Sequence, residues 1–324
     1  MRRRDFIAGA GAAAAWPLAG HAQQPTRMLR VGVLSIAESE ATAALDGFRT
    51  GLRDLGHVEG QTVILDFRFA KGDFAAMPAL TEALVHIPVD VIFTDSSTAA
   101  RAALSVTHTV PIVIGLGFDP VSAGLVASFS HPGGNVTGMT IGVNELGGKR
   151  IELLRQAFPT LVRVTVLQNP STPLAAPFLR ATENAAKALG IEITKLSASN
   201  SDDLRALEPA ALSGSDGLVV LNDSMFWNYR AIIVGLAAAA GIPAIYPERD
   251  YADDGGLMAY GANVPDAFRR AAGYVDRILR GAKPGDLPID EASKFDFVIN
   301  LRTAHGLGLS LPPLFLARAD EVIE

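Results

Sequence analysis

The feature that most constrains this 324-residue chain is a pattern of strands and helices that occurs twice. Short runs rich in β-branched residues alternate with longer helical segments, which is typical of parallel α/β proteins. The two copies share an offset of 132 to 134 residues in three matched pairs: Val31 with Val164, Gly56 with Gly190, and Pro111 with Pro243. A near-constant offset over four strands and three helices predicts two similar α/β lobes in tandem.

The expected elements can be placed along both copies. The first copy predicts strands at 29–36, 62–70, 89–95 and 110–116 and helices at 44–56, 77–87 and 97–106. The second predicts strands at 162–170, 191–198, 215–223 and 242–248 and helices at 178–190, 201–212 and 229–241. After Glu248 we expect one helix to return to the first lobe and a last strand to return to the second.

The predicted fold class is therefore α/β, with two Rossmann-like parallel-sheet lobes joined by a multi-strand hinge. We assign residues 28–139 with 258–293 to lobe 1, and residues 140–257 with 294–324 to lobe 2. Several crossings between lobes form a hinge rather than a loose linker, which suits closure around a small ligand.

The N-terminus predicts export. Residues 1–24 have a basic start, a small-residue apolar stretch and a small-x-small end at Gly20-His21-Ala22, which together indicate a signal peptide. Arg3-Arg4-Asp5-Phe6-Ile7 is similar to the twin-arginine export motif, with an ordinary secretory signal as the alternative. The chain has no cysteine to carry a lipid anchor, so we expect a soluble periplasmic protein.

Composition and motifs argue against several classes of function. A net charge of −6 without a basic block disfavours nucleic acid as a partner. The six histidines are scattered, none with H-x-x-x-H spacing, and we predict no metal and no cofactor. The sequence has neither a G-x-S-x-G elbow nor a strand-linked G-x-G-x-x-G, so we predict no catalytic residues.

Polar residues follow the predicted strands where a binding site is expected. In an open parallel sheet, ligands bind outside the carboxyl ends of the strands. Six loops, three from each lobe, contain small polar or acidic residues at these ends. The candidate ligand-binding residues are Ser35, Asp95, Ser96, Ser97, Thr98, Asp119, Asn169, Ser171, Asn222, Asp223, Tyr246 and Glu248.

Each of these residues has a structural alternative. Asp223 can bind a ligand ammonium through a charge-assisted hydrogen bond or cap the following helix, and the two roles are compatible. The hydroxyls at 96–98 can bind a carboxylate together with helix N–H groups, or act only as caps. Phe226, Trp227 and Tyr246 can line a ligand pocket or belong to the core.

Six stretches of the mature chain carry a resemblance to a known family. They read "GFRTGLRDLGHVEGQTV", "DPVSAGLVASFSHPGGNVTGMT", "GKRIELLRQAFP", "PAIYPERDYADDGGLMAYG", "VDRILRGAKPGDLPID" and "SKFDFVINLRTAHGLGLSLPPLFLARADEVIE". The chain resembles the ABC-transporter substrate-binding proteins related to the tryptophan-binding protein, which have the type I periplasmic binding protein fold.

This resemblance implies a receptor, expected to be a monomer, that closes on a small solute and delivers it to a membrane permease driven by an ATPase. It implies an amino-acid ligand, aromatic or branched, whose ammonium binds Asp223 and whose carboxylate binds residues 96–98. The rival interpretations are an exported α/β hydrolase or oxidoreductase, and a ligand-sensing domain of a signalling system.

Two departures from the family pattern bear on the ligand. The loop "TDSSTAA" adds Asp95 and has Thr98 where relatives often have proline, and Asn222 also stands where proline is common. A carboxylate next to a carboxylate-binding loop is unfavourable at close range. Either Asp95 points away from the site, or the ligand is not a plain amino acid.

Overall fold

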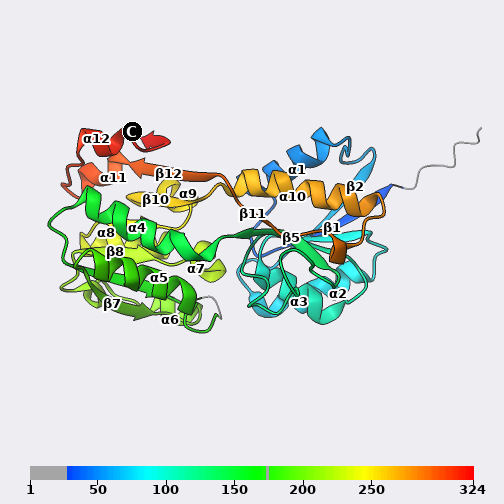
Figure 1. Cartoon of the computed structure of the whole chain (residues 1–324), viewed down its shortest axis with the longest axis horizontal. Helices are drawn as coiled ribbons and strands as arrows, with labels where there is room; N and C mark the ends of the chain where they lie inside the picture. The colour runs from blue at the N-terminus through cyan, green and yellow to red at the C-terminus, as the bar shows by residue number, and fades with distance from the viewer. Residues whose placement is uncertain (1–27, 173–174) are drawn as a thin grey trace, which may run out of the picture.

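The structure is a computed structural model that describes residues 28–172 and 175–324. The expected signal peptide, residues 1–24, lies outside the described residues. Two sheets form two lobes that lie side by side along the long axis of the molecule (Figure 1). No helix in the described part of the chain is long and apolar enough to cross a membrane.

The first lobe is built on a six-stranded sheet of order β11-β5-β4-β3-β1-β2. Its strands are β1 (Leu29–Ser35), β2 (Val63–Phe69), β3 (Val91–Thr94), β4 (Ile112–Phe118), β5 (Val136–Ile141) and β11 (Asp290–Glu291), all paired in parallel. Its helices are α1 (Ala43–Asp54), α2 (Met77–Val85), α3 (Ser97–Val106) and α10 (Val264–Leu279), with 3-10 turns at η1 (Phe74–Ala76) and η3 (Pro284–Asp286).

The second lobe has a seven-stranded sheet of order β13-β12-β10-β9-β8-β6-β7, in which only the β10–β12 pair is antiparallel among the described strands. The strands are β6 (Arg163–Gln168), β7 (Glu192–Ser197), β8 (Gly217–Val220), β9 (Ala244–Tyr246), β10 (Met258–Ala262), β12 (Phe295–Asn300) and β13 (Glu321–Ile323). The helices are α4 (Val143–Ala157), α5 (Ala175–Ala188), α6 (Ser201–Arg205), α7 (Ser224–Asn228), α8 (Arg230–Ala240), α9 (Arg249–Asp253), α11 (Leu301–Gly306) and α12 (Pro313–Leu316), with a 3-10 turn at η2 (Pro209–Leu212).

The eight strands predicted in the two copies are all present, but one predicted helix is wrong. The segment 201–212 forms two pieces, α6 and η2, separated by residues 206–208. Pro209 explains the break, because proline lacks the N–H of a continuing helix and disfavours helical backbone in the residue before it.

The crossing between the lobes also differs from the expected boundary. Residues 258–293 were assigned to lobe 1, yet β10 pairs with β9 and β12 in the second sheet. β10 is an interior strand of that sheet, between β9 and β12. The chain therefore enters lobe 1 later than expected, at Asn263, whose side chain caps α10. The expected helix that returns to lobe 1 is α10, which lies along α1 in Figure 1. The expected last strand is β12.

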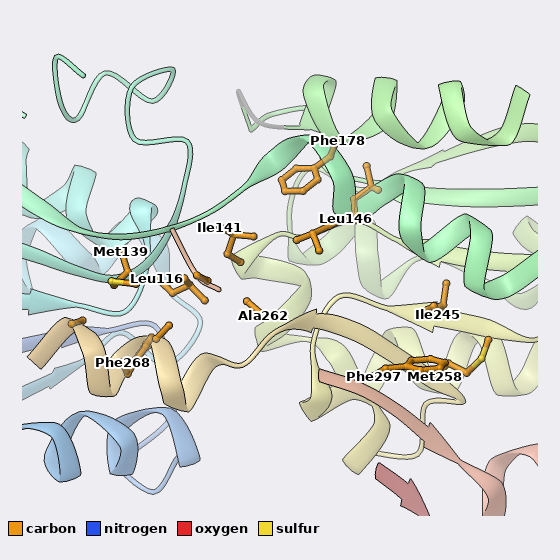
Figure 2. Close-up of a cluster of buried hydrophobic side chains, with 14 of the residues drawn as sticks. Leu116, Met139, Ile141, Leu146, Phe178, Ile245, Met258, Ala262, Phe268 and Phe297 are labelled. Carbon is orange, nitrogen blue, oxygen red and sulfur yellow. The ribbon is translucent and has the colours of Figure 1, made fainter. Parts of the chain in front are cut away.

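The apolar core continues from one lobe into the other. One hydrophobic cluster includes Met139 and Phe268 of lobe 1 and Leu146 and Met258 of lobe 2. Figure 2 shows Ile141 and Ala262 between these two groups, at the points where the chain crosses. The core therefore surrounds the hinge rather than ending at each lobe.

Helix α10 packs closely on α1, where α1 has glycine at the interface. A Cβ on Gly51 would lie 2.3 Å from the Arg269 carbonyl oxygen and 2.8 Å from the Ala272 Cβ. Gly47, one turn earlier, approaches the Pro265 carbonyl oxygen in the same way. These small residues allow the C-terminal helix to lie directly on the N-terminal lobe.

We therefore expect Gly51→Ala to destabilise the protein by about 1–3 kcal/mol, since the added methyl group overpacks the α1–α10 interface. Gly235→Ala is the matched control. Gly235 is an exposed residue of α8 with open space at its Cβ position, so alanine should stabilise the helix there by about 0.5–1 kcal/mol. Urea unfolding followed by circular dichroism measures both changes, and equal effects of the two substitutions would contradict the close packing.

Candidate functional site

A cavity of about 380 Å³ lies between the lobes and is lined by both. The first lobe contributes the end of β1, the start of α1, the β3–α3 loop and the end of β4. The second contributes the loops that lead into α7 and α9, and the crossing into α10 completes the wall. The starts of five helices thus meet at the carboxyl ends of the strands, where parallel sheets bind ligands.

Asp95 is the acidic residue that the first lobe places in the cavity. Its Oδ2 accepts hydrogen bonds from the Ser35 hydroxyl, at 2.6 Å, and from the Ile36 N–H, at 2.7 Å. Its Oδ1 is buried and has no hydrogen-bond partner among the described residues. Burial raises the pKa of Asp95, although the bonds from Ser35 and Ile36 and the neighbouring Ser96 hydroxyl oppose the shift.

The three hydroxyl residues after Asp95 have separate roles. Ser96 lines the cavity and caps α3 by accepting a hydrogen bond from the Ala99 N–H. The Ser97 hydroxyl bridges the backbone of Phe118, accepting from its N–H at 2.9 Å and donating to its carbonyl at 3.1 Å. Thr98 is exposed and does not line the cavity. A loop of three free hydroxyls for a ligand carboxylate is therefore not present.

Asp223 lines the cavity from the second lobe and also caps a helix. Its Oδ1 accepts hydrogen bonds from the N–H groups of Met225, at 2.8 Å, and Phe226, at 3.2 Å. Its Oδ2 accepts from the Asn169 side chain at 3.1 Å. Burial raises the pKa of Asp223 to about 6, against the effect of these hydrogen bonds. The helix cap expected at Asp223 is therefore confirmed and the residue lines the cavity, while its binding of a ligand ammonium stays a prediction.

Glu248 is the second acidic residue that lobe 2 contributes to the cavity. Its Oε1 accepts a long hydrogen bond, 3.4 Å, from Asn222, and its Oε2 is buried without a partner among the described residues. Burial, reinforced by Asp250, raises the pKa of Glu248 to about 7 against the opposing charge of Arg150. Asn169 and Asn222 are both buried behind the cavity, where each supports one of its carboxylates.

Arg150 of α4 stands behind this group and is completely buried. It donates from Nε to the Tyr260 carbonyl at 2.8 Å and from Nη2 to the Pro247 carbonyl at 3.4 Å. Burial lowers the pKa of Arg150 to about 10, against the attraction of Glu248. Its hydrogen bonds join α4 to β10 and to the loop that carries Glu248.

Seven of the twelve predicted site residues do not line the cavity: Ser97, Thr98, Asn169 and Asn222, described above, and also Asp119, Ser171 and Tyr246. Asp119 caps a turn by accepting from the Ser122 N–H and faces a separate hollow that includes Tyr260. Ser171 is exposed and donates its backbone N–H to Asn169. Tyr246 is 1% exposed and stacks on Tyr251 at 5.0 Å between ring centroids, so it belongs to the core.

Of the two aromatic residues in α7, Phe226 and Trp227, one lies in the core and the other lines the cavity. Phe226 is fully buried in the core of lobe 2, whereas Trp227 lines the cavity and donates from Nε1 to Asp250 at 2.6 Å. Trp227 and Phe74 of lobe 1 each pack against the cores of both lobes. Gly72 of lobe 1 lies so near Asn228 that a Cβ would be 2.3 Å from its side-chain nitrogen. The lobes therefore contact each other beside the cavity as well as at the hinge.

Sequence reasoning missed the walls made by the start of α1 and by the crossing into α10. Thr42 and Asn263, which cap these helices, both line the cavity. Their cap signals are readable in the sequence: a polar residue precedes each apolar helical pattern, and Pro265 follows Asn263. What the sequence lacks is any indication that these helix starts face the other lobe.

Comparison with known families matches residues 30–323 to the model of the ABC transporter substrate binding protein family. This chain belongs to that family. The tyrosine-binding protein of Clostridioides difficile (strain R20291) is 26% identical over 280 residues, which cover 86% of this chain and 81% of that protein.

Two solved structures have a similar fold. A conserved domain protein from Vibrio cholerae O1 biovar eltor is 29% identical with a TM-score of 0.85, covering 91% of this chain and 100% of the other. An ABC domain from Streptococcus pneumonia, solved in complex with L-Trp, is 23% identical with a TM-score of 0.84, covering 91% and 99%.

Membership of the family confirms the resemblance seen in the sequence and the expected two-lobed fold. The family consists of substrate-binding proteins and not enzymes, and the curated relative is a tyrosine-binding protein, so the hydrolase and oxidoreductase alternatives are set aside. Membership also implies a small-molecule ligand and a transporter permease as partner.

The raised pKa of Glu248 predicts how stability depends on pH. A carboxyl whose pKa is about 7 when folded and near 4.5 when unfolded favours the folded state at low pH, and this contribution is lost as pH rises between those values. The groups that set this pKa are Asp250, Arg150, Asn222 and Arg230. We expect Glu248→Gln to raise the free energy of unfolding by about 2 kcal/mol at pH 8 and to change it little at pH 4.

Urea unfolding at both pH values measures this effect. The control is Glu192→Gln on β7, where the side chain is exposed and an effect within about 0.5 kcal/mol is expected at either pH. A Glu248→Gln protein less stable than the parent at pH 8 would show that the buried charge is well compensated.

Proposed function

We propose that this chain is the extracytoplasmic receptor of an ABC importer and that it binds an amino acid, or a closely related small amine, between its lobes. The observation that carries the proposal is the cavity itself, which receives carboxylates from both lobes. Its volume of about 380 Å³ suits a solute of about thirteen to nineteen non-hydrogen atoms, given roughly 20–30 Å³ for each. Delivery then requires a permease and an ATPase in the inner membrane.

The chemistry of the cavity supports an amine as ligand. Buried carboxylates bind an ammonium through charge-assisted hydrogen bonds, which are stronger than neutral ones. Leu116, Phe118, Trp227 and Phe268 supply apolar surface for a side chain or an aliphatic stem. The relatives named above, a tyrosine-binding protein and an L-Trp complex, support an aromatic amino acid as one candidate.

The proposal includes export and lobe closure. The signal peptide at 1–24, with its twin-arginine-like motif, would deliver a monomeric receptor to the periplasm. The lobes would be residues 28–141 with 263–293 and residues 142–262 with 294–324, with the predicted boundaries at 139/140 and 257/258 moved to follow the ends of β5 and β10. Closure around the solute brings the two sets of carboxylates to the same ligand.

A thermal-shift screen of residues 25–324 against amino acids, amines, sugars, purines and organic acids tests this function. A ligand at a hundred times its dissociation constant stabilises the protein by about 2.7 kcal/mol, which should raise the midpoint by several degrees. Amines or amino acids should give the largest shifts. Shifts from sugars or purines alone would contradict the proposed ligand class.

Asp223→Ala provides the matching mutational test. The variant should lose about 1 kcal/mol of stability through its helix cap and should weaken binding of the best amine at least tenfold. Asn200→Ala is the matched control, because Asn200 also caps a short helix through two N–H groups but lies outside the cavity. If Asn200→Ala weakens binding as much, the loss reflects stability and not ligand contact.

A further inference from the structure

The cavity has far more acidic than basic side chains. Six carboxylates line it, from Asp95, Asp223, Glu248, Asp250, Asp253 and Asp296, against the single guanidinium of Arg249. That guanidinium is already held by Glu321, at 2.7 Å from Nη2, and by Asp253, at 3.2 Å from Nε. No other lysine, arginine or histidine lines the cavity in the part of the chain that the structure describes.

Three of the six carboxylates form hydrogen bonds or ion pairs with other residues that line the cavity. Asp253 pairs with Arg249, Asp250 accepts from the Trp227 indole, and Asp296 accepts from Asn263 at 2.8 Å and 3.1 Å. Asp223 uses both oxygens in three hydrogen bonds within lobe 2. Each of these four groups can still accept a hydrogen bond from a ligand, but none of them has an oxygen that is both buried and unpaired among the described residues.

Asp95 and Glu248 differ from the other four. Each lines the cavity and has one buried oxygen, Oδ1 of Asp95 and Oε2 of Glu248, without a hydrogen-bond partner among the described residues. A buried acceptor left unpaired costs free energy, so a donor from the ligand at that position gains more than it would in water. Asp95 comes from lobe 1 and Glu248 from lobe 2.

We infer that the cleft takes a small solute with two cationic groups, one bound by Asp95 of the first lobe and the other by Glu248 of the second. This inference rests on the proposed receptor function and names its ligand class. The shared chemistry is found in α,ω-diamines and in amino acids with a cationic side chain. Only a solute that reaches both carboxylates bridges the lobes, so both cationic groups contribute to holding them closed.

A plain amino acid and a basic one both bring a carboxylate, but only the basic one offsets its cost with a second ammonium, so a plain amino acid fits this cavity less well. Its carboxylate would need a cation or free donors, yet Arg249 is engaged and the Ser97 hydroxyl is bonded to Phe118. On the lobe 1 side it would also approach Asp95. In a dicationic solute, the aliphatic chain between the two cationic groups would pack against Leu116, Phe118 and Phe268 of the cavity wall.

Binding of a cation should release protons near neutral pH. With the pKa of Glu248 at about 7, roughly half of the free protein carries a proton there at pH 7, and a bound cation favours its loss. Asp223, with a pKa of about 6, follows at lower pH. The charged, titratable and polar groups that face Glu248 are Asp250, Arg150, Arg230, Tyr251 and Asn222. Affinity should therefore fall as the pH is lowered from 8 to 5.

Isothermal titration calorimetry on residues 25–324 tests the inference with matched pairs of probes. L-Lysine is compared with L-norleucine, and 1,5-diaminopentane with 1-aminopentane, because each pair differs by one terminal ammonium. The dicationic member should bind at least tenfold more tightly in at least one pair. Which pair responds tells a basic amino acid from a diamine. Titrations in buffers of different ionisation enthalpy should show proton release at pH 7.

Variants assign the two contacts. Asp95→Asn and Glu248→Gln should each weaken the dicationic probe at least tenfold and reduce its advantage over the monocationic one, and Glu248→Gln should abolish most of the proton release. Glu192→Gln, on the exposed edge strand, should leave affinity unchanged. Melting curves check that the variants are folded, and Glu248→Gln is expected to be the more stable of the two.

Other outcomes separate this inference from the receptor function. Tight binding of L-norleucine, L-tyrosine or L-tryptophan, with no preference for a second cation, overturns the inference and leaves an amino-acid receptor. A thermal shift only from solutes without an amine overturns the inference and the proposed ligand class, while a binding protein remains. If no solute in the broad screen stabilises the protein, both the inference and the proposed function fail.

Discussion

The three places where the described part of the chain crosses between the lobes are the constraint on which the rest of the structure depends. They lie at Gly142, at Asn263 and at residues 292–294, and each joins one sheet to an element of the other lobe. Because the lobes are connected through strands and a continuous core, the carboxyl ends of both parallel sheets are held toward one space. The return of α10 onto α1 completes this arrangement, since it ties the last third of the chain to the first lobe. The cleft is a consequence of that connectivity.

The cleft concentrates acidic side chains where helix starts meet. Asp223 precedes α7 and Glu248 precedes α9, so the positive ends of these helices favour the carboxylates in ionised form, while burial disfavours it. Asn169, Asn222 and Arg150 support the carboxylates from behind through hydrogen bonds or charge. A buried charge with incomplete partners reduces stability in the empty protein. Its presence at the cavity wall is therefore better explained by a ligand than by the fold.

Much of the fold could be predicted because it depends on local pattern. The alternation of β-branched runs with helical segments located all eight strands of the repeated unit, and the constant offset showed that they form two lobes. Predictions weakened where tertiary partners decide the outcome. The run at 258–262 is as compatible with one lobe as with the other until its pairing with β9 and β12 is known. The helix at 201–212 was broken by Pro209, a local signal that could have been used.

For the site, the sequence by itself determined which residue types stand at the strand ends, because strand boundaries follow from hydrophobic pattern. Asp95, Ser35, Ser96, Asp223 and Glu248 were found in this way and line the cavity. The tertiary structure decided the rest. It placed Tyr246 in the core, turned Ser97 toward Phe118 and brought Thr42 and Asn263 to the cavity wall. The physical reason is that a side chain's direction, and its hydrogen-bond partners from distant segments, depend on how the lobes pack and not on the residues beside it in the chain.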